Sequence, residues 1–342
     1  MTTETRPSAR DVLTHSRAAF DPALRTAVDS LPGSLRHIAG YHFGWWDADG
    51  TPADADHGKA IRPAMTLRAA AAVGGSALAA VPAAVAVELV HNFTLLHDDV
   101  MDRDHTRRHR PTAWTVFGVG QAILAGDALL TLAYEVLATD CSPAFRDAAK
   151  ALSQAVLAVQ DGQALDLSFE SRTDVTLPEC VRMAHLKTAA LLGCATGLGA
   201  LYGGASPDRV ALLRTFGEKI GLAFQLVDDL LGIWGDPDVT GKPVHSDLVS
   251  RKKSLPVVAA LGADNPTSTR LRELYFSPGA LSPTDAAACA DLVADAGGRA
   301  WCQSEISALF TTARTALRDG STRERPIAEL TALAELIVRR DH

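Results

Sequence analysis

Four aspartates crowd into seven residues at the end of an apolar segment, at positions 98, 99, 102 and 104. On a helix, Asp98 and Asp102 would lie one turn apart and share a face with Glu88 and His91. Clustered carboxylates tend to take up protons unless a cation neutralises them. Carboxylate oxygens without softer ligands suit Mg²⁺, which completes its coordination with water and substrate phosphates. The stretch indicates a metal–diphosphate site, with a solvated acidic helix end as the alternative.

Basic side chains recur at separate places in the chain. Arg107 and Arg108 follow the acidic stretch, and a forked guanidinium fits phosphate oxygens well. If a helix begins near Gly58, Lys59 and Arg62 project from one face at its N-terminus, an end that favours anions. The remaining basic candidates are Lys187, Lys242 and Lys252. Each alone is compatible with an ordinary surface residue.

A second acidic pair, Asp228–Asp229, follows 130 residues after Asp98, with Gln225 one helical turn before it. Because of this separation, only the tertiary fold could bring the two pairs close together. If both face one cavity, their carboxylates could hold more than one Mg²⁺ around a diphosphate.

Composition sets limits on the class of protein. The chain has 342 residues, of which 47% are hydrophobic and 21% charged, and its net charge of -7 argues against nucleic acid or an anionic membrane as the main partner. Five scattered cysteines without metal-ligand spacing and the lack of a signal peptide predict a reduced, cytoplasmic protein. The charge-free stretches 69–87 and 188–207 are broken by glycine or proline, which favours buried helices over stable membrane spans.

The elements that must position these residues are helices. From Ala64 onward, apolar residues recur at helical spacing, and no strand-like alternation stands out. We expect residues 1–15 to be loosely held and residues 265–283 to be a polar, looser region. The predicted helices include 17–38 with a break at Pro32–Gly33, 118–137, 145–161, 177–201, 210–234 and 255–261. One all-α domain over residues 1–342 is the simplest interpretation.

Eight motifs together resemble the trans-isoprenyl diphosphate synthase (polyprenyl synthetase) family, and most closely a geranylgeranyl diphosphate synthase. They occur in the family's order between about residues 58 and 256. They are G-K-A-I-R-P at 58–63, L-L-H-D-D-V-M-D at 95–102, R-R-H-R-P-T at 107–112, G-Q-A-L-D at 162–166, K-T at 187–188, F-Q-L-V-D-D at 224–229, G-K-P at 241–243 and K-K-S-L-P at 252–256.

The resemblance implies a homodimer of single all-α bundles, each around a deep central cavity. It implies about three Mg²⁺ ions per active site, with Mn²⁺ as a substitute. Asp98 and Asp102, with Asp99 in support, would bind metal on an allylic diphosphate, and Asp228 and Asp229 would bind a further ion. Around the allylic substrate it places Arg107, Lys187, Gln225, Lys242 and Lys252, with Thr188 near the reacting carbon. Around isopentenyl diphosphate it places Lys59, Arg62, His91 and Arg108. His91 is alternatively a hydrogen-bonded core histidine.

The implied reaction joins isopentenyl diphosphate to dimethylallyl, geranyl or farnesyl diphosphate after ionisation of the allylic C–O bond. Phe93, five residues before Asp98, lies about 7.5 Å along a helix from it. In the family, one aromatic at this position resembles the C20 pattern, so geranylgeranyl diphosphate is the expected product. A plain core role for Phe93 is the alternative.

One position departs from the family pattern. Gly232 stands where the second acidic motif normally has a third aspartate. Because Asp228, Gly232 and Asp236 are four residues apart, a class I terpene cyclase is an alternative, with Arg182 as its diphosphate sensor. A non-catalytic subunit that modulates another synthase is a third possibility, although the intact Asp98–Asp102 motif argues against it.

Overall fold

The computed structural model describes residues 7–53, 55, 58–140, 142–237 and 243–338. The chain is 76% helical and has almost no strand, which confirms the all-α class. It divides into two compact units, each described by itself below. Unit 1 comprises Met1–Val156, Cys194–Arg214 and Leu317–Leu333, and unit 2 comprises Leu157–Gly193, Thr215–Ala316 and Ala334–His342. Lys242 lies outside the described residues.

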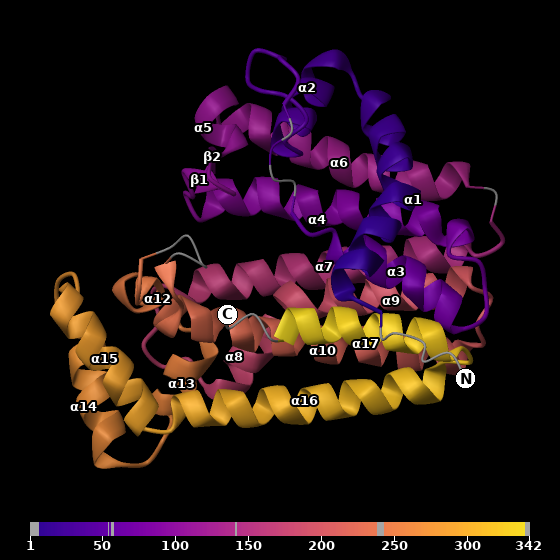
Figure 1. Ribbon diagram of the computed structural model, residues 1–342. Helices are drawn as coiled ribbons and strands as arrows, with labels where there is room; N and C mark the ends of the chain where they lie inside the picture. Colours follow the sequence, from indigo (N-terminus) through magenta and orange to yellow (C-terminus); the bar gives the residue numbers. More distant parts are fainter. Residues whose placement is uncertain (1–6, 54, 56–57, 141, 238–242, 339–342) are drawn as a thin grey trace. The chain divides into compact units, whose positions relative to one another are not determined.

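Unit 1 is built around two long helices, α4 and α6, which lie side by side (Figure 1). α4 is apolar on most of its circumference and buries Leu89, Phe93 and Leu96. Gly126 of α6 allows the close approach, because a side chain there would overlap the His97 ring of α4. The unit includes α1 (Ala9–Asp29), α2 (Gly33–His42), α3 (Ile61–Ala72), η1 (Leu78–Ala80), α4 (Val81–Met101), β1 (Thr106–Arg107), β2 (Arg110–Pro111), α5 (Ala113–Phe117) and α6 (Val119–Thr139).

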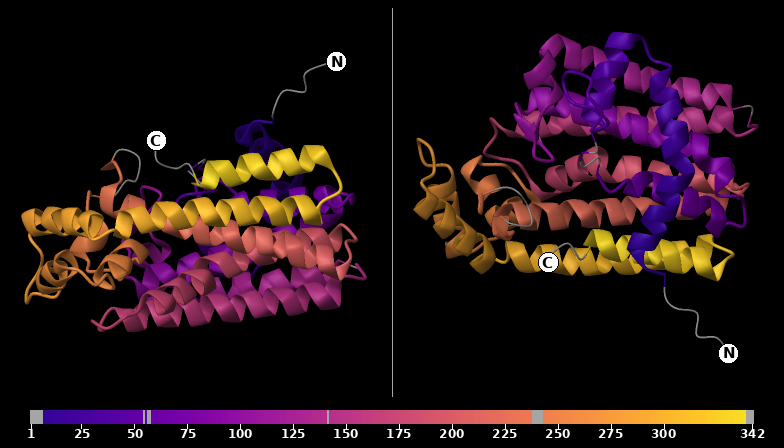
Figure 2. Two further views of the ribbon diagram at one scale, coloured as in Figure 1. Left: turned by 90° about the horizontal axis from the view of Figure 1, so that it is seen from below. Right: turned by 45° about the horizontal axis from the view of Figure 1, so that its top comes forward.

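Unit 2 gathers the helices around the second acidic pair. Its apolar core joins α13, α14 and α15 through buried residues such as Val257, Leu271 and Val293. Figure 2 shows α14 and α15 lying together at one end of the unit. The elements are α8 (Leu177–Ala184), η2 (His185–Ala189), α12 (Ser246–Val249), α13 (Leu255–Leu261), α14 (Pro266–Tyr275) and α15 (Pro283–Asp295).

Five further helices have their residues in both units. They are α7 (Phe145–Phe169), α9 (Ala190–Tyr202), α10 (Pro207–Trp234), α16 (Gly298–Gly320) and α17 (Glu324–Val338). α9 falls in the glycine-rich stretch 188–207, where glycines were expected to break a helix. Instead α9 is continuous through Gly199, where it lies directly against α3, and Gly203 contacts α3 just after the end of α9. Small side chains therefore serve packing in this helix rather than ending it.

Three local features differ from the sequence-based expectations. α1 begins as early as Ala9 because the Ser8 hydroxyl caps it, accepting from the Asp11 N–H at 3.4 Å, and because Val12 is buried. α14 occupies the polar region 265–283, where the Asn265 side chain caps the helix and Leu271 and Tyr275 supply a buried face. The two short strands form a hairpin that was not predicted.

Two helical segments in the described part of the chain are long and apolar enough to cross a membrane by length and composition. They are Leu78–Met101 and Val119–Thr139, rather than the charge-free stretches noted in the sequence. Such a pair is weak evidence, since core helices of soluble proteins pass the same test. The most apolar window of the first segment is 61% buried and that of the second is 39% buried.

Candidate active site

In each acidic pair, one aspartate is buried and its neighbour is more exposed. Asp98 is half-buried and Asp228 is exposed, whereas the side chains of Asp99 and Asp229 are 2% and 3% exposed. Successive residues of a helix point about 100° apart, so one carboxylate of each pair turns inward. The inward carboxylate of each pair binds a cationic side chain. The outward carboxylates are therefore the ones placed to meet a ligand.

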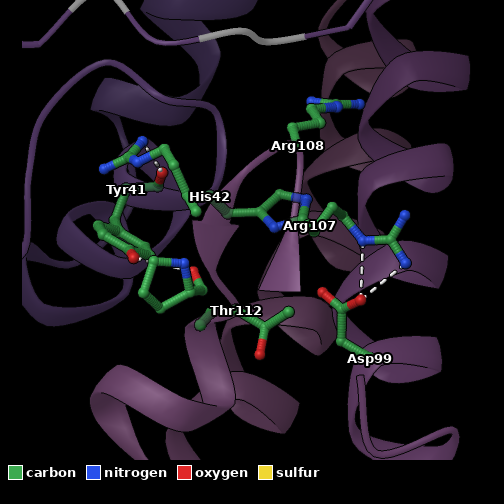
Figure 3. A pocket seen from close by; sticks show the side chains of 9 residues that line it. Tyr41, His42, Asp99, Arg107, Arg108 and Thr112 are labelled. Atoms are coloured by element: carbon green, nitrogen blue, oxygen red, sulfur yellow. Dashed lines mark hydrogen bonds and ion pairs between the residues drawn. The ribbon is translucent and has the colours of Figure 1, made fainter. Parts of the chain in front are cut away.

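The inward aspartate of the first pair anchors Arg107. Both Nε and Nη2 of Arg107 lie 2.7 Å from Oδ1 of Asp99 (Figure 3). Burial raises the pKa of Asp99, and the Arg107 guanidinium opposes that rise. Asp98 and Asp102 lie one turn apart at the end of α4, where the Asp102 N–H donates to the Asp98 carbonyl at 2.8 Å. Asp98 and Asp102 thus lie at the end of α4, and Arg107 of β1 is held there through Asp99.

A strained hairpin holds the two arginines. Arg107 pairs with Arg110 across it, and the turn residues Arg108 and His109 have φ of 51° and 61°. Two-residue hairpins favour this backbone conformation but usually place asparagine or glycine there. Larger residues cost about 1–3 kcal/mol each in such conformations, which persist where surrounding contacts enforce them. Here Arg107 bonds Asp99, and the Thr112 hydroxyl donates to the Asp104 carbonyl at 2.8 Å.

A pocket next to this hairpin is lined by guanidinium groups and a buried histidine (Figure 3). Burial and the nearby Arg108 and Arg107 lower the pKa of His42 to about 3, so its imidazole is neutral at pH 7. Its Nε2 is buried and has no hydrogen-bond partner among the residues that the structure describes. Such a donor-rich pocket suits an anion. The lining residues are Tyr41, His42, Asp99, Arg107, Arg108, Arg110, Pro111, Thr112 and Ala113.

The structure brings most of the residues predicted for isopentenyl diphosphate together in unit 1. Nη1 of Arg62 lies 3.1 Å from Nε2 of His91. Burial, and after it Arg62, Arg108 and Arg107, lower the pKa of His91 well below its usual value. The Arg108 guanidinium lies against Gly58, where a Cβ would fall 2.6 Å from Nη2. Arg62, His91 and Arg108 therefore form one basic cluster beside Gly58.

Lys59 is placed differently from the expectation that it shares a helix face with Arg62. Lys59 is exposed and precedes α3, which begins only at Ile61. Ala60 between them has φ of 51°, a left-handed conformation that turns the chain before the helix starts. The expected helical relationship of Lys59 and Arg62 is therefore wrong, although Lys59 directly adjoins Gly58 of the basic cluster.

In unit 2, the lysine–threonine motif lies on a turn of π-helix, η2. π-Helical turns occur frequently at functional sites. Nζ of Lys187 lies 2.6 Å from Oδ2 of Asp166 on α7. Gly162 makes this contact attainable, because a Cβ there would lie 2.8 Å from the Lys187 Cα. Gly162 and Asp166, one helical turn apart, thus contact the same lysine: Gly162 its backbone and Asp166 its charged side chain.

A chain of hydrogen bonds links Thr188 to the second acidic pair. The Thr188 hydroxyl donates to Oε1 of Gln225 at 2.6 Å, and Nε2 of Gln225 donates to Oδ1 of Asp229 at 2.9 Å. Oδ2 of Asp229 accepts from the Leu255 N–H at 2.9 Å. Burial raises the pKa of Asp229, while Lys252 opposes the rise. Asp229 therefore fixes the start of α13 and the orientation of Gln225.

Lys252 lies among several carboxylates of unit 2. Its Nζ is 3.5 Å from Oδ1 of Asp229 and 3.7 Å from Oδ2 of Asp247. Burial lowers the pKa of Lys252, but Asp229 and Asp247, with Asp166 and Asp228, outweigh burial and raise it. The lysine therefore stays charged and counters the repulsion among these aspartates.

The carboxylate oxygens of the outward aspartates are donors that suit magnesium. Among the described residues, no group of three or more His, Cys, Asp or Glu side chains is arranged to hold a metal ion. Mg²⁺ is usually bound by one or two carboxylates, with water and substrate phosphates completing its shell. Asp98 with Asp102, and separately Asp228, offer oxygen donors of this kind at the ends of α4 and α10.

Sequence reasoning missed three residues that the structure places beside predicted site residues: His42 in unit 1, and Asp166 and Asp247 in unit 2. The sequence could have indicated Asp166, because this residue ends the G-Q-A-L-D motif one helical turn after Gly162. No sequence pattern indicates His42 or Asp247, because tertiary packing alone determines their positions. Arg182, the proposed cyclase sensor, is 64% exposed and lies 2.9 Å from Asp161.

Residues 53–292 match the model of the polyprenyl synthetase family. The chain belongs to this family, the trans-isoprenyl diphosphate synthases, and it makes a prenyl diphosphate.

Individual relatives agree with this family but differ in product. A (2E,6E)-farnesyl diphosphate synthase of Mycobacterium tuberculosis is 47% identical over 99% of this chain and 94% of its own length. A geranylgeranyl diphosphate synthase of the same organism is also 47% identical, over 96% and 93% of the two chains. The crystal structure of a polyprenyl synthetase from Streptomyces coelicolor A3(2) matches with a TM-score of 0.92 and 48% identity, over 96% of this chain and 99% of that one.

Proposed function

We propose that this protein condenses isopentenyl diphosphate with an allylic diphosphate, with Mg²⁺, and releases geranylgeranyl diphosphate. The observation that carries the proposal is the shared design of the two acidic pairs. Each pair presents one outward aspartate and anchors a cation, Arg107 or Lys252, through the other. The two pairs supply the carboxylates and the positive charge that two diphosphate substrates need.

The proposed roles are those that the family resemblance implies. Asp98, Asp102 and Asp228 hold the metal, while Arg107, Lys187 and Lys252 face the departing diphosphate. Bound Mg²⁺ would neutralise charge that builds on the leaving oxygen. The basic cluster of Arg62, His91, Arg108 and Lys59 holds isopentenyl diphosphate by its diphosphate. In the cluster, His91 accepts a hydrogen bond from Arg62, so it orients that guanidinium even if it does not touch substrate.

Support for the metal comes from a solved relative. The crystal structure of geranylgeranyl pyrophosphate synthase from Corynebacterium glutamicum is complexed with isoprenyl diphosphate and magnesium. It is 28% identical to this chain, covers 97% of each chain and has a TM-score of 0.77. We propose three Mg²⁺ per site, replaceable by Mn²⁺, in a cytoplasmic protein whose 342 residues act as one domain.

The product length is proposed from Phe93. Its ring is buried, lies edge-on to His97 at 4.8 Å and borders Gly126 of α6. Nε2 of His97 is in turn 3.1 Å from the Ile123 carbonyl, so the pair is held firmly between α4 and α6. An aromatic ring fixed in this way is suited to end a channel for the growing hydrocarbon.

Phe93→Ala should shift the product beyond C20, because truncation removes the floor of that channel. Mass spectrometry of products made from farnesyl and isopentenyl diphosphates measures the shift. Leu137→Ala, a truncation at a fully buried position of α6, controls for general loss of packing and should leave the product unchanged. If Phe93→Ala loses stability but keeps the parent product, Phe93 is only a core residue.

The homodimer is proposed from the exposed apolar side of α6. Val119, Ile123 and Leu124 are 47%, 38% and 54% exposed on this helix. Contiguous apolar surface of this kind marks an interaction site, and a second copy of the chain is the partner that the resemblance implies.

Leu124→Asp should weaken the dimer by at least about tenfold in dissociation constant, since it places a charge in an apolar interface. Sedimentation velocity across a concentration series measures the change. Leu78→Asp is the matched control, as Leu78 is 68% exposed on η1. A parent protein that stays monomeric, or equal weakening by both substitutions, would remove α6 as the interface.

The function is tested by an omission experiment. The purified protein receives Mg²⁺, isopentenyl diphosphate and each of three allylic diphosphates in turn, and single components are then withheld. A synthase forms a longer prenyl diphosphate only when both substrates and Mg²⁺ are present. Hydrocarbon formed from a long prenyl diphosphate alone would identify a cyclase, and no turnover in any mixture would favour a regulatory subunit.

A further inference from the structure

Arg110 joins strand β2 to the end of α2 and to the loop that follows α2. Its Nη1 donates to the Tyr41 carbonyl at 3.2 Å, and its Nη2 donates to the Trp46 carbonyl at 3.1 Å. Nη2 also lies 3.0 Å from Oδ1 of Asp47. The guanidinium carbon stands 4.4 Å from the centroid of the Tyr41 ring. One side chain of the hairpin thus contacts three oxygens and one aromatic ring outside the hairpin.

The segment that Arg110 contacts is held by further hydrogen bonds. Tyr41 is buried, and its hydroxyl donates to the Pro111 carbonyl at 2.8 Å. Nε1 of Trp46 donates to the His37 carbonyl at 2.7 Å, which ties the loop back to α2. Arg110 is therefore bonded to a part of unit 1 whose position is already fixed.

The turn between β1 and β2 needs such support. Arg108 and His109 have φ of 51° and 61°, values that glycine adopts readily and larger residues do not. Arg107 ties the first strand to α4 through Asp99, and Arg110 is paired with Arg107 across the hairpin. Each strand therefore carries one arginine that ties it to a neighbouring helix, and the strained turn lies between these two arginines.

We propose that Arg110 is a positioning residue for both substrate diphosphates: it holds the turn in its left-handed conformation and so fixes Arg107 and Arg108 in place. This inference rests on the proposed function, which assigns Arg107 to the allylic diphosphate and Arg108 to isopentenyl diphosphate. Arg110 acts through the hairpin, because its guanidinium is bonded to oxygens of the protein. Loss of Arg110 should therefore weaken the use of both substrates and not of one alone.

Four proteins test this role: the parent, Arg110→Met, His109→Gly and the double substitution. Steady-state kinetics gives kcat and KM for each substrate, at a temperature at which thermal unfolding shows every protein to be folded. Arg110→Met should lower kcat/KM for both substrates by about 10- to 100-fold. His109→Gly alone should stay within about threefold of the parent, because His109 is exposed and glycine accepts a positive φ. The double substitution should regain at least about fivefold, because glycine keeps the turn without the support of Arg110.

Two further variants separate the hairpin from charge and from packing. Arg110→Lys keeps the positive charge but lacks the planar fork that reaches several oxygens, so it should show most of the loss. Kinetics like those of the parent would mean that charge alone suffices, and would overturn the proposal. Arg25→Met is the matched control, because Arg25 of α1 lies 5.2 Å from the Trp46 ring on the same loop. It should leave kcat/KM unchanged for both substrates.

Binding of inorganic diphosphate with Mg²⁺, measured by isothermal titration, adds a readout that needs no turnover. Arg110→Met should weaken this binding, and the added His109→Gly should restore it. If Arg110→Met lowers only the unfolding temperature, or if the double substitution is no better than Arg110→Met, the inference is wrong. Should Arg110→Met fail to fold, Arg110→Lys takes its place in the same comparison. A parent that forms no prenyl diphosphate contradicts the proposed function instead, and the titration then still decides the role of Arg110.

Discussion

Asp98→Ala lowers kcat by about 10³-fold or more, because it removes the outward carboxylate that begins the first acidic motif. Asp98 is half-buried at the end of α4, and its carbonyl accepts the Asp102 N–H at 2.8 Å, so the backbone of the motif survives truncation. The loss should therefore fall on metal-assisted ionisation rather than on folding. Steady-state kinetics over a range of Mg²⁺ concentrations measures it.

Asp104→Ala is the control for this result. Asp104 is exposed, belongs to the same acidic stretch and lies outside the D-D-x-x-D motif. Its removal takes the same charge from the same region and should change kcat by less than about tenfold. Equal losses in the two variants would mean that general electrostatics, and not a metal bound by Asp98, explain the effect.

Arg107→Met should lower the free energy of unfolding by about 3 kcal/mol at pH 7.5, besides weakening binding of the allylic diphosphate. The reason is the buried partner. Asp99 is 2% exposed at its side chain, and both of its contacts at 2.7 Å come from Arg107. Without Arg107 the carboxylate is left charged and buried, which costs several kcal/mol unless it takes up a proton.

The pH dependence follows in sign from the pKa of Asp99. Burial already raises this pKa in the native state, and loss of Arg107 raises it further. A group with a raised native pKa binds its proton more readily when folded, so lower pH favours the native state. The cost of Arg107→Met should shrink between pH 7.5 and pH 5.5. Denaturant titration at the two pH values measures it.

Arg107→Met combined with Asp99→Asn supplies the control. The neutral amide removes the buried charge, so the double variant should be more stable than Arg107→Met at pH 7.5. Its stability should also vary less with pH. If Arg107→Met is as stable as the parent at pH 7.5, the ion pair contributes nothing and the anchoring role of Asp99 is wrong.

The all-α class was predictable from sequence because helical periodicity is a local signal. The same holds for the shared face of Asp98 and Asp102, which needs only the helical repeat. The family motifs added residues whose partners lie far away in sequence, such as Lys187 and Gln225. Their hydrogen-bonded partners, Asp166 and Thr188, then followed from the structure.

Other features depend on packing that no local pattern encodes. His42 gains its low pKa because burial at the end of α2, and after it the arginines of a distant hairpin, disfavour the charged imidazole. The π-helical turn at Lys187 is fixed by contacts of Gly162 and Gly221 with its backbone. A Cβ at Gly232 would lie 2.5 Å from Cγ of Asp247 on a separate helix, a proximity that no local pattern indicates. Tertiary contacts decide each of these cases.

We propose that Asp98 and Asp228 are both required for Mg²⁺-dependent binding of the allylic diphosphate. The direct measurement is isothermal titration with an unreactive thio analogue of farnesyl diphosphate, with Mg²⁺ and with chelator. Binding should tighten strongly with Mg²⁺ in the parent, and this gain should vanish in Asp98→Ala and, separately, in Asp228→Ala. Binding that does not depend on Mg²⁺, or that depends on only one of the two aspartates, would contradict this requirement for both motifs.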